Sequence, residues 1–173
     1  AVLQKAVEFF VWFEKEFPDV VGEPAFLLYA ALAYYRVGSL GKARGYLLDT
    51  MLSNIYLLPY LFSRPMPKQD MWHSSNWAQP DYIEEIEELL EGPTSQEREW
   101  FQEQFENELF TSIRSKCIET FHALQHAKEL DSRRRILGEW RDYFHLVVQT
   151  RYNQWQHGDR FSAALRLQTG TCA

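Results

Sequence analysis

The chain has 173 residues, of which 46% are hydrophobic and 16% aromatic, enough apolar material for one substantial core or two small cores that share a helix. A formal net charge of -6 argues against a protein whose main task is to neutralise the phosphates of nucleic acid. No stretch is long and uncharged enough for a membrane span or a secretory signal. The two cysteines, Cys117 and Cys172, are far apart and match no metal-binding or redox spacing. We therefore expect an intracellular protein, cytoplasmic or nuclear, without a cofactor.

The first third of the chain predicts three helices. Apolar residues recur at helical spacing over 2–17, and Pro18 ends this first helix. A nearly all-apolar second helix is expected over 25–37, closed by Gly38, and a third over 42–53. Small residues let the second and third helices approach closely as an antiparallel hairpin: Ala30, Ala31, Ala33 and Ala43.

This hairpin resembles a tetratricopeptide repeat. At the eight signature positions of that repeat the chain has Leu27, Ala30, Ala31, Tyr34, Ala43, Leu47, Thr50 and Ile55. It departs from the pattern at Leu27, where Trp is usual, and at Ile55, where Pro is usual. The helix over 2–17 resembles the second half of a preceding repeat, with Ala6, Phe10 and Pro18 at matching positions. The resemblance covers about one and a half repeats, residues 1–57.

The resemblance implies a protein-interaction or scaffolding module rather than an enzyme, binding a protein or peptide partner as a fragment or subunit of a larger assembly. Arrays of such repeats bind partners on a concave face formed mainly by the first helix of each repeat. Here that face would comprise Leu28, Tyr29, Leu32, Tyr35 and Arg36. The alternative is that the chain's own loop over 65–80 covers this face.

Residues 54–62 resemble the segment after the last repeat in relatives of the suppressor-of-tumorigenicity-seven group, although the first proline of that motif is missing. The basic, proline-bearing stretch 64–68 would be the loop that follows it. We expect 58–80 to form an ordered connecting loop, because it carries apolar anchors at Met66, Met71, Trp72 and Trp77.

Residues 81–173 predict a helical extension that packs on the first part. One helix begins at Asp81 and ends at 92–93. The next opens with a capping box, Thr94-x-x-Glu97, and continues to about residue 130, with room for a break. A last helix starts from an N-cap at 131–132 and ends at Gly158, before a frayed tail over 170–173. With no alternating strand pattern anywhere, the predicted fold is all-α.

One alternative function is a helical metal-dependent enzyme. Glu119-x-x-His122 and Asp142-x-x-His145 each place a carboxylate and an imidazole on one helix face, and two such helices can hold metal ions together. His126 follows His122 by one turn, but Ala123 stands where a zinc protease needs its glutamate.

A second alternative is an RNA-associated helical protein. Its basis is the basic triplet Arg133, Arg134 and Arg135. The nearby Glu129 and Asp131 dilute that charge, and the strongly acidic stretch over 81–108 offers the triplet an intramolecular partner. Nucleic acid is therefore not the expected partner.

Overall fold

The structure is a computed structural model that describes residues 1–155. This range contains helices and no β-strand, which confirms the all-α prediction. Its eight α-helices are α1 (Val2–Glu16), α2 (Pro24–Arg36), α3 (Leu40–Ser53), α4 (Leu57–Leu61), α5 (Tyr82–Glu85), α6 (Ser95–Glu106), α7 (Glu108–His126) and α8 (Leu130–Tyr143). Two 3-10 helices, η1 (Asn76–Ala78) and η2 (Glu87–Glu91), and a π-helix, η3 (Phe144–Gln149), complete the order. The expected helix end at Gly158 and the tail over 170–173 lie outside the described residues.

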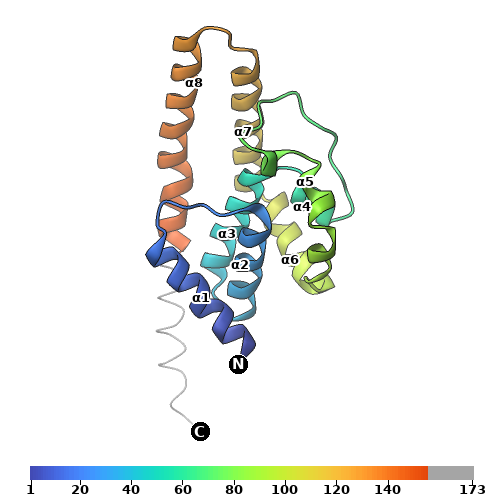
Figure 1. Cartoon of the computed structure of the whole chain (residues 1–173). Coiled ribbons are helices and arrows are strands. Elements are labelled where there is room, and N and C mark those ends of the chain that lie inside the picture. Colours follow the sequence, from blue (N-terminus) through green and yellow to red (C-terminus); the bar gives the residue numbers. More distant parts are fainter. Residues whose placement is uncertain (156–173) are drawn as a thin grey trace.

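Helices α2 and α3 form the central hairpin (Figure 1). Pro24 occupies the first turn of α2, where a missing N–H costs nothing, and Gly38 ends the helix with a φ of 78°. The eight positions that carry the repeat resemblance are all buried, from Leu27 to Ile55. The three alanines among them have no exposed surface, as close approach of the two helices requires.

Helix α1 lies obliquely across α2 and α3 (Figure 1). Only Phe10 of this helix is buried, and its ring contacts those of Phe26, Tyr34 and Tyr46. One side of α1 therefore packs on the hairpin while the other side remains exposed.

The segment over 81–91 differs from the single helix that the sequence predicts. It forms the short α5 and then the 3-10 helix η2, with the chain tightening at Ile86. Glutamates at three- and four-residue spacing, without a basic partner in the segment, disfavour a regular helix by repulsion. Residues 58–61, predicted as the start of the connecting loop, belong to α4 instead.

The long helix predicted from residue 95 is broken at Asn107, whose extended backbone ends α6 and whose side-chain oxygen accepts a hydrogen bond from the Phe110 N–H at 2.9 Å. Helices α7 and α8 then run antiparallel and extend beyond the rest of the molecule (Figure 1). Helix α8 begins at Leu130 rather than after an N-cap at 131–132. Within the described residues, no helix combines the length and apolar character needed to cross a bilayer.

Candidate functional site

The exposed side of α1 carries large aromatic side chains. Phe9 and Trp12 on α1 and Phe17 directly after it are each more than 40% exposed. The Trp12 ring contacts the other two, with its centroid 5.7 Å from that of Phe9 and 5.6 Å from that of Phe17. We call these three residues the aromatic surface. Val20 and Val21 extend its exposed apolar character into the connector between α1 and α2.

An open groove of about 580 Å³ adjoins the aromatic surface. Its lining is almost entirely apolar and comes from α1, the α1–α2 connector, α2, η1 and η2: Phe13, Gly22, Glu23, Ala25, Phe26, Tyr29, Trp77 and Leu89. Phe13 connects groove and surface, because its ring lies 4.7 Å from Phe26 and 5.3 Å from Phe17. We call this feature the α1–η2 groove.

The segments that form the groove are uniformly acidic. Residues 16–29 and 77–91 contain no Lys or Arg, and their acidic residues are Glu16, Asp19, Glu23, Asp81, Glu84, Glu85, Glu87, Glu88 and Glu91. All of these except Glu23 are exposed. Lys15, 3.9 Å from Glu16, is the nearest basic side chain along the chain. The groove therefore has an apolar floor within acidic surroundings.

The predicted partner-binding face of α2 is covered by the chain itself. Leu28 and Leu32 are buried, and the Tyr29 hydroxyl donates to the Leu89 carbonyl oxygen at 2.7 Å. Tyr35 packs against Trp100 at 4.8 Å, and Arg36 pairs with Glu97 at 2.7 Å. The contacts of Tyr29, Tyr35 and Arg36 thus come from η2 and α6, while Trp77 of the loop over 65–80 lines the groove beside Tyr29.

The three arginines of the predicted basic patch have partners other than the acidic segment. Arg133 donates to the carbonyl oxygens of Leu124 and Ala127 and so closes the end of α7. Arg134 lies 3.5 Å from Asp131, and Arg135 lies 2.9 Å from Glu139. Both of these ion pairs are exposed and local, so the patch carries little net charge.

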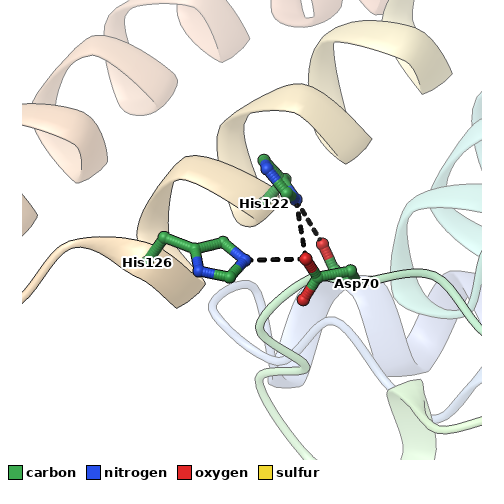
Figure 2. A group of neighbouring side chains, drawn as sticks. All are labelled: Asp70, His122 and His126. Carbon is green, nitrogen blue, oxygen red and sulfur yellow. Dashed lines mark hydrogen bonds and ion pairs between the residues drawn. The ribbon is translucent and has the colours of Figure 1, made fainter.

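The structure does not bring together the four predicted metal ligands. Glu119 lies 3.8 Å from Lys116, Asp142 lies 3.9 Å from Arg141, and the exposed His145 ring is beside Phe144. His122 instead lies beside His126 and Asp70 (Figure 2). The spacing of the two histidines was readable from the sequence, but no local signal connects them to an aspartate 52 positions earlier.

A second cavity of about 470 Å³, with both polar and apolar side chains in its wall, lies between α1, α3 and η3. In its wall the Glu14 carboxylate accepts hydrogen bonds from the hydroxyls of Tyr34 and Tyr46, at 3.0 and 2.6 Å, and from the Lys42 ammonium at 3.0 Å. Burial, together with the Glu14 charge, raises the pKa of both tyrosines well above the ordinary range. These hydroxyls thus stay protonated and serve as donors.

Comparisons with models of protein families, with curated protein sequences and with solved structures found no match to the chain.

Proposed function

We propose that the chain is an intracellular protein-interaction module of the tetratricopeptide-like type, a subunit or part of a larger assembly. Its docking site is the α1–η2 groove together with the aromatic surface. The occupant we propose is an amphipathic helix of a partner protein, with an apolar face and basic residues along its edges.

The exposed apolar area carries this proposal. Two large aromatic side chains on α1 and a third directly after the helix, next to an apolar groove, form the kind of contiguous patch that marks an interaction site rather than scattered surface residues. Aromatic residues are enriched where proteins bind each other, because they bury much surface with few rotatable bonds. Helix α1 is about 22 Å long, enough to accompany a partner helix for four turns.

Charge selects the class of partner. The acidic residues around the groove would repel an acidic segment and attract a basic one, and they argue against a phosphate-bearing partner. An apolar face bordered by Lys and Arg complements both the floor and the surroundings of the groove.

The hairpin supports the repeat-like part of the proposal. Its eight signature positions interlock in the core, and α1 covers only part of the hairpin while exposing its own outer side. A helix in a solenoid packs against neighbours on two sides, so an outer side rich in Phe and Trp is what a further helix would cover.

A peptide titration tests the docking site. The probe is a designed helical peptide with Leu on one face and Lys on the other, and its control is the same peptide with Glu in place of Lys. We expect the Lys peptide to bind in isothermal titration calorimetry and the Glu peptide to bind at least tenfold more weakly, with the difference shrinking at high salt.

Substitutions locate the site. Phe9→Glu and Leu89→Glu should each weaken binding of the Lys peptide at least tenfold, because each places a charge on the apolar contact. The matched control is Leu146→Glu, which changes a 75% exposed leucine beyond the groove and should leave binding unchanged. Equal binding of the two peptides, or equal behaviour of all three variants, would overturn the proposal.

A further inference from the structure

We propose that Asp70, His122 and His126 form a binding site for a divalent transition metal ion of the zinc type, which fastens the loop over 62–75 to helix α7. The inference is independent of the proposed docking site. It rests on the three side chains drawn in Figure 2 and on how the loop is held.

The two histidines point to the same side of α7 because they are one turn apart, with ring centroids separated by 4.7 Å. Asp70 faces both of them from the loop. Its carboxylate oxygen Oδ2 lies 2.7 Å from Nε2 of His126 and 3.4 Å from Nδ1 of His122, and its backbone oxygen lies 2.6 Å from the same Nδ1. One ligand atom from each residue can be chosen so that all three lie within 4.8 Å of one another.

These ligands suit zinc and its neighbours in the first transition series. Zn²⁺ takes imidazole nitrogen and carboxylate oxygen at about 2.0–2.2 Å in a tetrahedral arrangement, which places the ligand atoms about 3.4 Å apart. All three side chains are more than half exposed, so small rotations can bring the ligand atoms to that spacing. Solvent supplies water for the fourth position. Two imidazoles disfavour Mg²⁺ and Ca²⁺, which prefer oxygen ligands throughout.

The loop that carries Asp70 is fixed on either side of it. The Gln69 N–H donates to the Tyr56 hydroxyl at 3.0 Å, and Met71 is buried. The Trp72 N–H donates to the carbonyl oxygen of Phe121 in α7 at 3.0 Å, and the Trp72 ring stacks on that of Phe121. Asp70 is therefore held close to His122 before any ion arrives, so binding need not order the loop first.

A neighbouring histidine is not part of the site. Nε2 of His73 lies 2.8 Å from the Tyr56 hydroxyl, and its ring stacks on that tyrosine. Burial, aided by the Lys68 charge, lowers the pKa of His73. His73 thus belongs to the contacts that position the loop.

Competition with a chromophoric chelator tests the site in the full chain, stripped of metal and titrated with Zn²⁺. We expect one ion per chain, unaffected by millimolar Mg²⁺. His122→Ala, His126→Ala and Asp70→Asn should each weaken Zn²⁺ binding at least tenfold. His145→Ala and Glu119→Gln remove a histidine and a carboxylate that lie outside the group, and both should bind Zn²⁺ as the unchanged chain does.

Two further measurements make the result specific. Co²⁺ in place of Zn²⁺ should give the intense visible absorption of a four-coordinate ion, and the Asp70→Asn variant should lose it. Saturating Zn²⁺ should raise the Tm of the chain but not that of His126→Ala, because an ion bound to the folded state alone stabilises that state. Zinc binding that Asp70→Asn leaves unchanged, or that His145→Ala abolishes, would overturn the three-residue site.

Discussion

The guanidinium of Arg36 in α2 donates two hydrogen bonds to the Glu97 carboxylate in α6, from Nε to Oε1 at 2.7 Å and from Nη2 to Oε2 at 3.0 Å. The same carboxylate accepts a hydrogen bond from the Thr94 N–H at 2.7 Å, while the Thr94 hydroxyl oxygen accepts from the Glu97 N–H. Glu97 therefore caps its own helix and fastens that helix to the central hairpin.

We predict that Glu97→Gln lowers the free energy of unfolding by about 1–2 kcal/mol at pH 7, because the buried carboxylate loses a charge-assisted pair with Arg36. The Arg36 hydrogen bond lowers the pKa of Glu97, so its stabilisation is present above the ordinary value of 4.5 and is lost as the pH falls through the folded-state value. Urea denaturation at pH 7 and at pH 3 should show the difference between the two proteins shrinking in acid. Glu99→Gln, an exposed change in the same helix, is the control and should cost little at either pH.

Local features of the fold could be predicted from the sequence. The capping box is formed by Thr94 and Glu97 as predicted, because it depends on residues only three apart. The hairpin likewise follows from small residues at helical spacing and from Gly38 between the helices. In each case the deciding interactions are close in sequence.

Contacts between distant segments could not be predicted. The sequence predicts a partner-binding face that includes Arg36, because nothing near this residue in the chain reveals a glutamate 61 positions later. Asp70 stands alone in a loop, and only the fold places it beside His122. By charge alone the acidic stretch over 81–108 is a possible partner of the basic triplet at 133–135, whereas in the structure it packs on α2 and contributes Leu89 to the groove.

Gly92 and Tyr29 offer a test of how tightly η2 packs on α2. The backbone of Gly92 is in the helical region, so a side chain causes no strain there, but a Cβ at this position would overlap the Tyr29 hydroxyl and lie 3.2 Å from the ring carbon that carries it. We predict that Gly92→Ala costs about 1–2 kcal/mol of unfolding free energy. Combined with Tyr29→Phe, it should cost less than the sum of the two single changes, because the hydroxyl is gone.

The control for this substitution is Gly138→Ala. A Cβ at Gly138, within α8, meets nothing within 4 Å, so alanine should stabilise the chain by about 0.5–1 kcal/mol. Thermal and urea denaturation of the variants measure these changes. Similar effects at Gly92 and Gly138 would mean that η2 does not pack on Tyr29 as described.

The thiol of Cys117 should be unreactive in the folded protein. It is buried in α7, and burial raises the pKa of Cys117 to about 12, so very little reactive thiolate forms at pH 8. In a Cys172→Ser background, we expect a thiol reagent such as DTNB to label the denatured chain once and the native chain only at the rate of global unfolding. Rapid labelling of the native chain would contradict the packing around α7.

The Tyr152 hydroxyl donates a hydrogen bond to the Asp49 carboxylate, joining the helical residues 150–155 to α3. Burial raises the pKa of Asp49 to about 7, although the hydrogen bond from Tyr152 opposes the shift. Between the ordinary value of 3.8 and about 7 the folded chain therefore binds more protons at this site than the unfolded chain does. Under that condition stability falls as the pH rises.

We predict that ionisation of Asp49 lowers the free energy of unfolding by about 1–2 kcal/mol between pH 5 and pH 8. This is less than the pKa shift alone would give, because the side chain is only partly buried and solvent screens its charge. Asp49→Asn removes the titrating group, so the stability of this variant relative to the unchanged chain should increase over the same range. Tyr152→Phe removes the donor that favours the ionised carboxylate, so the decline should become steeper and extend to higher pH. Parallel stability curves for all three proteins, measured by urea denaturation from pH 5 to pH 8, would show that the packing of Tyr152 against α3 does not desolvate Asp49.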